Sequence, residues 1–279
     1  MKEVTFIMQG PLVSDSIRTI RLLKNFGNVI VSCWNTDPAN LIQAAANESD
    51  KIVINPFIEE KGYNFQNISY HITTSLNGLR ECKTQLAVKV RADEYFTDPS
   101  KLIKSIKQNK NKITVCNFLF RKGVILHPSD HILGGGKESL VSMFEESLKM
   151  VSKYKKNQRV KMTDLGIKES CAYKYLTAES TFCLSWLKVN NIDFLSDVVN
   201  MSEVQIEHYY RKMLKTYYCL VTASQLGRFL FRYKSSPDIY MPTAFTTEDQ
   251  FLYINERLMS IASFDDVQIT HLRNLEYED

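Results

Sequence analysis

Short apolar runs alternate with amphipathic segments through the first half of the chain. The amphipathic segments repeat apolar residues at three- and four-residue spacing, which predicts helices. The runs between them are nearly continuously apolar and rich in β-branched residues, as is typical of strands buried in a parallel sheet. This alternation predicts an α/β fold with a mostly parallel central sheet flanked by helices. The predicted strands are 4–8, 29–34, 51–57, 86–90 and 113–120, and the predicted helices are 14–26, 38–47, 64–82 and 99–110.

The pattern becomes less regular after residue 120. The irregular part covers 121–139, and within it the segment 127–136 is polar and glycine-rich, with no strand predicted. Because no internal repeat and no Pro/Gly/Ser linker occurs, we expect one domain over 1–279, with residues 1–120 and 121–279 as its two halves. The remaining predicted elements are helices at 138–154, 178–189 and 203–214, a strand at 217–223 and a final helix after 247.

Composition restricts the class of protein. The chain has 279 residues, of which 44% are apolar and 24% are charged, so it is long and apolar enough to fold around a core. Its net charge of +4 would not by itself attract nucleic acid, and we expect no nucleic-acid partner. The six cysteines form no C-x-x-C pair, and no uninterrupted apolar stretch is long enough to span a bilayer. We therefore expect a soluble protein of a reducing, cytoplasmic compartment.

The most informative motif is RADE, in which Arg91, Asp93 and Glu94 follow the fourth predicted strand. Ligands of parallel α/β sheets bind at the carboxyl ends of the strands. A carboxylate there can hold a divalent cation on a diphosphate, and an arginine can pair with a phosphate. The alternative is a surface turn that caps the helix beginning near Asp98. Local spacing alone leaves both interpretations open.

The order of the elements favours a ligand site. A polar turn, Gln9-Gly10-Pro11, ends the first predicted strand, and two strand–helix units precede the acidic strand end. That arrangement is typical of a domain half that binds a nucleotide-diphosphate sugar, with the base over the first strands and a metal near the fourth. The alternative for Gln9 and Gly10 is a tight turn that needs glycine for its backbone angles.

Five segments occur in an order that resembles the WavE-type family of lipopolysaccharide-synthesis proteins. They are TFIMQGPL, VIVSCW, TTSLNGLRECKTQLAVKVRADEYF, PSDHILGG and AESTFCLSWL, and they cover residues 4–190, with a weaker similarity in YCLVTASQLGRFLFRYKS. The resemblance implies a GT-A-like fold and a glycosyltransferase that moves a sugar from a nucleotide-diphosphate sugar, such as a UDP-sugar, to an acceptor. The implied acceptor is a glycan or a lipid-linked glycan.

The resemblance also implies roles for single residues. Asp93 stands at the last aspartate of the D-x-D metal motif of GT-A enzymes, whereas Arg91 replaces its first aspartate. Asp93 and Glu94 are therefore the expected ligands of Mn²⁺ or Mg²⁺, with fewer carboxylates than a full motif provides. Gln9, Gly10, Arg91 and Asp93 are expected to bind the donor. His71 is added to this set. The pair Tyr70-His71 stands where relatives are expected to carry Arg-Gln, so a different preference for base or donor is expected if this helix contacts the nucleotide.

Two further acids are expected to contact substrate. Asp130, in the segment His127-Pro128-Ser129-Asp130-His131, is expected to bind a sugar hydroxyl, although a turn-capping role is the alternative and the histidines are more often incidental. Glu179 opens a predicted helix, where an acid commonly complements the helix dipole. The resemblance instead implies that Glu179 deprotonates or orients the acceptor hydroxyl.

Two functions compete with glycosyl transfer. A sugar nucleotidyltransferase would carry a glycine-rich basic loop after the first strand, where GPLVSDSIR has only one glycine. A nucleotide-sugar-binding protein without catalysis would explain why Arg91 replaces an acid. Lysines gather at 101–112 and 149–161, and the second, denser group is the candidate for peripheral contact with an anionic membrane.

Overall fold

The computed structural model of the protein describes residues 2–57, 67–118, 120, 124–155, 158–227, 229–231 and 263–264. Its centre is a seven-stranded sheet with the order β3-β2-β1-β4-β7-β6-β8. All neighbouring strands pair in parallel except β7, which is antiparallel to both β4 and β6. The strands are β1 (Val4–Gln9), β2 (Asn28–Trp34), β3 (Lys51–Asn55), β4 (Leu86–Arg91), β6 (Ile113–Cys116), β7 (Leu133–Gly136) and β8 (Tyr218–Val221).

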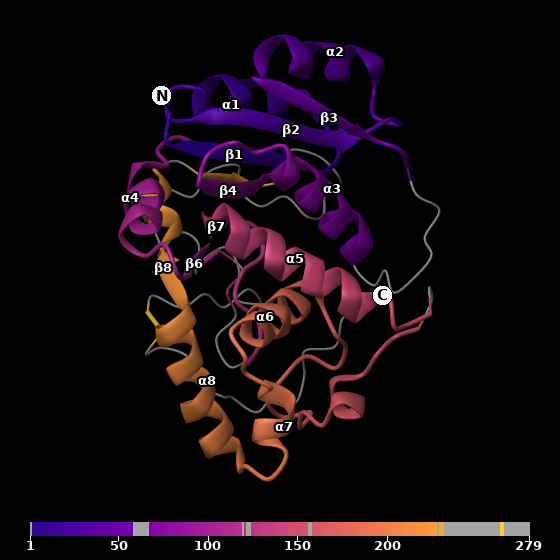
Figure 1. Ribbon diagram of the computed structural model, residues 1–279, viewed down its shortest axis with the longest axis vertical. Coiled ribbons are helices and arrows are strands. Elements are labelled where there is room, and N and C mark those ends of the chain that lie inside the picture. The colour runs from indigo at the N-terminus through magenta and orange to yellow at the C-terminus, as the bar shows by residue number, and fades with distance from the viewer. Residues whose placement is uncertain are drawn as a thin grey trace.

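Helices cover both faces of this sheet, which confirms the predicted fold class (Figure 1). Side chains alternate between the faces of a strand, and β1 shows the result. Ile7 belongs to one apolar core with α3, α5 and α6, whereas Phe6 and Met8 belong to a second core with α1, α2 and α4. The helices are α1 (Ser16–Leu23), α2 (Ala39–Glu48), α3 (Ile68–Arg80), α4 (Ser100–Gln108), α5 (Lys137–Val151), α6 (Ala178–Val189), α7 (Phe194–Val198) and α8 (Glu203–Tyr217).

No strand is predicted in the glycine-rich segment 127–136, but Leu133–Gly136 forms strand β7 inside the sheet. Glycine has low strand propensity, so the sequence LGGG carries no strand signal. The structure explains the glycines, since a Cβ on Gly134 would lie 2.3 Å from Cδ1 of Ile106 on α4. Glycine there lets a helix pack directly against the strand backbone.

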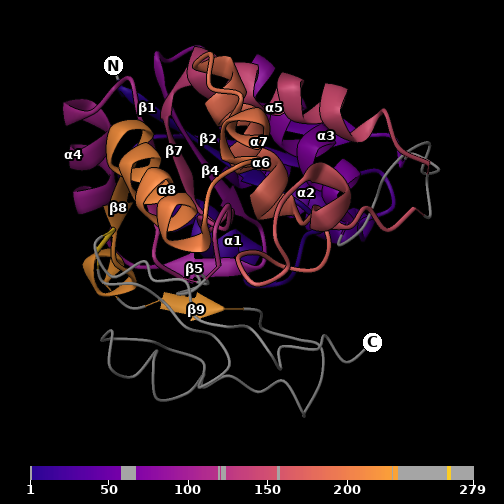
Figure 2. The same cartoon turned by 90° about the horizontal axis from the view of Figure 1, so that it is seen from below.

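Other element boundaries also differ from the predictions. The strand expected at 113–120 ends at Cys116, and the strand expected at 51–57 ends at Asn55. A small second sheet, β5 (Glu94–Phe96) with β9 (Phe229–Phe231), was not predicted (Figure 2). The helix expected after residue 247 lies outside the described residues, and the division into two halves at residue 120 remains a prediction. Within the described ranges, no helix combines the length and apolarity needed to cross a bilayer.

Candidate active site

The carboxyl ends of β1 and β4 bring two predicted donor-binding residues together. Gln9 and Arg91 are the last residues of these strands and are register partners. The Gln9 side chain is buried, and its Oε1 accepts a hydrogen bond of 2.8 Å from Thr74 Oγ1 on α3. Gly10 follows with φ +104°, a backbone angle that favours glycine, and its N–H donates to the Ser32 carbonyl at 3.2 Å. The turn and the ligand-site interpretations of this segment are therefore compatible.

Arg91 and Asp93 form a bidentate pair at the end of β4. Arg91 Nε donates to Asp93 Oδ1 and Arg91 Nη2 donates to Asp93 Oδ2, both at 2.8 Å. Burial disfavours the charge of the guanidinium, but Asp93 and the nearby carboxylates of Glu94 and Asp130 outweigh this effect and raise the pKa of Arg91. The arginine therefore stays charged, and the pair is part of the site rather than a solvated surface turn.

Glu94 is the first residue of β5 and is almost fully buried. Its Oε1 makes a close contact with His131 Nδ1 and lies 3.5 Å from Arg91 Nε. Its Oε2 is buried and has no hydrogen-bond partner among the described residues. An unpaired carboxylate oxygen inside a protein is costly unless water or a ligand satisfies it. Glu94 therefore presents a hydrogen-bond acceptor to whatever occupies the site.

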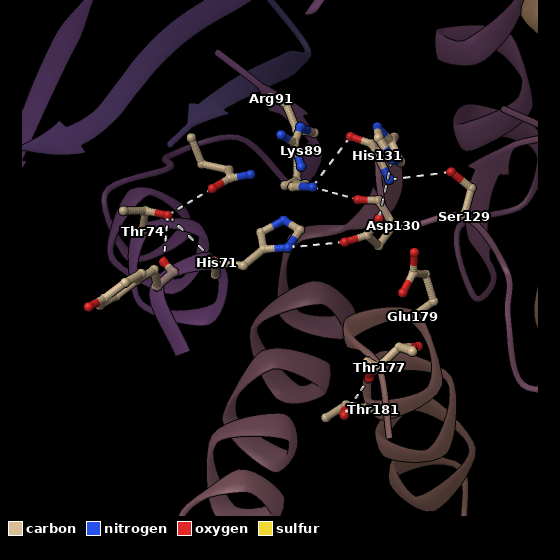
Figure 3. Close-up of polar contacts among 12 residues, drawn as sticks. His71, Thr74, Lys89, Arg91, Ser129, Asp130, His131, Thr177, Glu179 and Thr181 are labelled. Atoms are coloured by element: carbon tan, nitrogen blue, oxygen red, sulfur yellow. Dashed lines mark hydrogen bonds and ion pairs between the residues drawn. The ribbon is translucent and has the colours of Figure 1, made fainter. Parts of the chain in front are cut away.

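Lys89 holds the segment that carries Asp130 and His131, and the sequence analysis missed it. Its side chain is fully buried, and its Nζ donates to the main-chain carbonyls of Asp130 and, at 3.4 Å, of His131 (Figure 3). Burial lowers the pKa of Lys89 to about 8, although the charge of Asp130 opposes this shift. The sequence does contain a signal for it, namely a lysine within the apolar run LAVKV. Because lysine is almost never fully buried unless it has partners, this position indicates a buried polar contact.

His71 and Asp130 form a second buried pair, which joins α3 to the segment before β7. His71 Nδ1 lies 3.1 Å from Asp130 Oδ2. Burial and the charge of Lys89 lower the pKa of His71 to about 4, so the imidazole is neutral at neutral pH. Burial alone would raise the pKa of Asp130, but the His71 hydrogen bond and the charge of Lys89 lower it well below its usual range.

The protonation of this pair defines what His71 offers to a ligand. Because Asp130 is ionised, the single proton of the neutral imidazole is assigned to Nδ1, which donates to the carboxylate. His71 Nε2 is then a bare acceptor, and it is buried without a hydrogen-bond partner among the described residues. His71 thus presents a second unsatisfied acceptor in the same site.

Glu179 lies in the first turn of α6, and it does not cap that helix. The cap is Thr177, whose Oγ1 accepts from the backbone N–H of Ser180 at 3.2 Å. The Glu179 carboxylate points toward the segment that carries Asp130 (Figure 3), and its Oε1 lies 3.5 Å from His127 Nε2. Its Oε2 is buried and has no hydrogen-bond partner in the described ranges. Glu179 is therefore a third acceptor, and its nearest ionisable partner is His127, for which the sequence analysis assigned no role.

An aromatic cluster lies at the carboxyl ends of β2 and β3 and was also missed. The ring centroids of Trp34 and Tyr70 are 5.4 Å apart, and those of Phe57 and Tyr70 are 5.1 Å apart. Trp34 is buried, whereas Phe57 is 48% exposed and leaves part of the cluster open to a ligand. The three residues are far apart in the sequence, so no local pattern predicts the cluster.

The described side chains do not fit a bound divalent cation. Both Asp93 oxygens bind Arg91, and Glu94 Oε1 contacts His131. Across the described ranges, no three His, Cys, Asp or Glu side chains come together in a metal-binding arrangement. Mn²⁺ and Mg²⁺ prefer several oxygen ligands. The metal role expected for Asp93 and Glu94 thus remains a prediction without support from the donor atoms.

The family model described as WavE lipopolysaccharide synthesis matches residues 4–269. The chain belongs to this family. The match confirms the resemblance stated from the sequence segments and connects this WavE-family protein with lipopolysaccharide synthesis. It extends well beyond residue 190, through the part of the chain that contains α8 and β8.

Similar solved structures include two proteins. HddC from Yersinia pseudotuberculosis is 13% identical, with a TM-score of 0.35, and the match covers 50% of the WavE-family chain and 79% of HddC. The 4-diphosphocytidyl-2C-methyl-D-erythritolsynthase from Anaerococcus prevotii is 11% identical, with a TM-score of 0.42 and coverage of 91% and 95%. No curated protein matches the chain.

Proposed function

We propose that the protein is a glycosyltransferase that moves a sugar from a nucleotide-diphosphate sugar to a glycan or lipid-linked glycan acceptor. The observation that carries the proposal is that three acceptor atoms at this edge of the sheet, His71 Nε2, Glu94 Oε2 and Glu179 Oε2, are buried with no hydrogen-bond donor among the described residues. A sugar is rich in O–H donors, which are the groups that such acceptors bind. Family membership in lipopolysaccharide synthesis supports a carbohydrate substrate.

The nucleotide is assigned to the carboxyl ends of β1, β2 and β4. Arg91 follows β4 and can donate to a phosphate, because its guanidinium presents more N–H groups than the two that bind Asp93. The partly open cluster of Trp34, Phe57 and Tyr70 can stack against a base. Gln9 and Gly10 lie at the carboxyl end of β1, next to Arg91 in the register.

In the proposed reaction, Glu179 acts as the general base. The bond between the anomeric carbon and the diphosphate oxygen breaks, and its electron pair leaves with the nucleoside diphosphate. The acceptor oxygen bonds to the anomeric carbon, and its proton passes to Glu179 Oε2, the oxygen that makes no hydrogen bond to the described part of the chain. Asp130 is assigned to a sugar hydroxyl, through Oδ1, since its Oδ2 pairs with His71.

The test compares Glu179→Gln with Glu138→Gln. Both residues are acids in the first turn of a helix, α6 and α5 respectively, but the Glu138 side chain is 83% exposed and lies outside the proposed site. We expect Glu179→Gln to slow transfer by about 10²- to 10⁴-fold, the usual contribution of a general base, while nucleotide binding persists. Glu138→Gln should behave like the wild type. Full activity of Glu179→Gln would exclude Glu179 as the base.

A peripheral contact with an anionic membrane belongs to the same proposal. At the amino ends of β1 and β4, a groove of about 480 Å³ is lined by Lys2, Lys83, Lys107 and Lys110, with Glu3 as the single acid. Lys107 pairs with Glu3, which leaves an excess of positive charge. This groove is a further candidate for the contact, beside the lysines of 149–161. Sedimentation with phosphatidylglycerol vesicles should decrease in Lys83→Gln/Lys110→Gln, and unchanged sedimentation would contradict the contact.

A further inference from the structure

We propose that Arg91 supplies the positive charge at the donor diphosphate, so that nucleotide binding and transfer need no divalent cation. This inference rests on the proposed function. It starts from the position of Arg91, which occupies the place where the resemblance expects the first metal-binding carboxylate. At that place the structure has a guanidinium, and the guanidinium binds the carboxylate of Asp93 that a metal would require.

Both carboxylate oxygens of Asp93 are already occupied by Arg91. Each of its two oxygens accepts a charge-assisted hydrogen bond of 2.8 Å from Arg91. Both side chains are largely buried, with 22% of Arg91 and 18% of Asp93 exposed. A metal would have to displace the arginine from a partly desolvated bidentate pair, which is a strong arrangement. Among the described residues, no second and third ligand stand beside Asp93 to compensate.

Arg91 retains N–H donors that can bind a phosphate. Its contacts with Asp93 use one N–H of Nε and one of Nη2, and a guanidinium has five. No hydrogen bond from Nη1 exists to any part of the chain that the structure describes. A planar guanidinium matches phosphate oxygens in a bidentate manner. Arg91 can therefore hold Asp93 with one edge and a diphosphate with another.

Two largely buried cations and several carboxylates lie together at the end of β4. Residues two apart on a strand face the same side of the sheet, so Lys89 and Arg91 place two cations on one side of β4. The carboxylates of Asp93, Glu94 and Asp130 lie close to these two cations, and Glu94 also contacts His131. The negative charge that develops on the leaving diphosphate then meets an arginine fixed by Asp93. A fixed cation can stabilise that charge without reorganising during the reaction.

The test measures nucleotide binding by isothermal titration calorimetry. The probes are UDP, GDP, CDP and TDP, each in EDTA and again in Mn²⁺ or Mg²⁺. We expect one of them to bind with the same affinity, within about threefold, in both conditions. Arg91→Met should weaken that binding by about 10- to 100-fold, as expected for losing a charged hydrogen-bond donor. Arg80→Met is the matched control, because Arg80 is an exposed arginine that pairs with Glu145 at 3.1 Å outside the site.

A second variant keeps the test decisive if Arg91→Met folds poorly. Arg91→Asp places a carboxylate two residues before Asp93, and we expect this variant to bind the nucleotide only when Mn²⁺ is added. Metal-free binding by Arg91→Asp as tight as that of the wild type would overturn the inference. Wild-type binding that requires a metal would overturn it too, while the proposed function would stand. No binding of any nucleotide in either condition would contradict the proposed function itself.

Discussion

Gly78 fixes the distance between α3 and the sheet, and its replacement by alanine gives the sharpest test of the packing. A Cβ at this position would lie 2.4 Å from Cγ2 of Ile7 on β1 and 3.2 Å from Cβ of Ser32 on β2. Helix propensity alone predicts that alanine stabilises a helix interior by about 1 kcal/mol relative to glycine. The close packing predicts instead that alanine at this position destabilises the protein.

The magnitude follows from what must move. Inserting a methyl group into a packed core costs about 1–3 kcal/mol, and the upper part of that range applies because the obstructing methyl belongs to a β-branched residue in a central strand. The gain of about 1 kcal/mol in helix propensity offsets part of a packing cost of about 3 kcal/mol. We therefore expect Gly78→Ala to lower the free energy of unfolding by about 2 kcal/mol. Urea denaturation should show a lower midpoint with an unchanged slope.

A double-mutant cycle identifies the cause. Ile7→Ala removes the obstructing methyl and should by itself cost about 2–5 kcal/mol. The double variant should cost less than the sum of the two single variants, since the new Cβ then occupies vacated space. Gly78→Ala with wild-type stability, or higher, would refute the close packing. Because α3 carries His71 and Thr74, we also expect Gly78→Ala to weaken nucleotide binding.

Three further predictions concern buried charge and the aromatic cluster. Lys89→Met should remove a pH dependence of the free energy of unfolding. The pKa of Lys89 falls from 10.5 to about 8 on folding, so wild-type stability relative to the variant should rise by about 3 kcal/mol from pH 8 to 10.5. A difference that does not change with pH would contradict the buried charge. His71→Phe should act in the acid range. The folded pKa of His71, about 4, lies below the ordinary 6.5, so wild-type stability relative to the variant should fall by about 3 kcal/mol as the pH falls from 6.5 to 4, measured by urea denaturation at each pH. Phe57→Ala should weaken nucleotide binding by about 1–3 kcal/mol with little loss of stability, whereas Val204→Ala, at a 75% exposed position on α8, should change neither; equal calorimetric affinities would exclude Phe57 from the base site.

Much of the fold could be predicted from sequence because apolar runs and helical spacing report burial directly. The strands at Val4–Gln9, Asn28–Trp34 and Leu86–Arg91 follow from such runs. Strand β7 could not be predicted, because Gly134 is required by the close approach of Ile106 and has no strand propensity of its own. The close contact at Gly134 comes from α4, and those at Gly135 and Gly136 include the backbone at Lys112 and Lys110, so the constraints on LGGG come from other parts of the chain.

In the candidate site, too, the positions of residues at strand ends are predictable from sequence, whereas their side-chain contacts are not. Arg91 and Asp93 were predicted as site residues because they end an apolar strand, and the structure places them beside Gln9. Their pairing with each other, rather than with a metal, depends on side-chain geometry that spacing does not determine. The links from His71 to Asp130 and from Lys89 to the same segment join residues 41 or more positions apart. Such contacts arise only from the tertiary fold.

The most direct test of the proposed transfer is product analysis in two parallel incubations. One contains a nucleotide-diphosphate sugar with a lipopolysaccharide-derived glycan acceptor, and the other contains a nucleoside triphosphate with a sugar 1-phosphate. For a glycosyltransferase we expect the first to release nucleoside diphosphate and to yield a longer glycan, with both products lost in Glu179→Gln. Pyrophosphate released in the second incubation, with no glycan product in the first, would instead identify a sugar nucleotidyltransferase and contradict the proposed function.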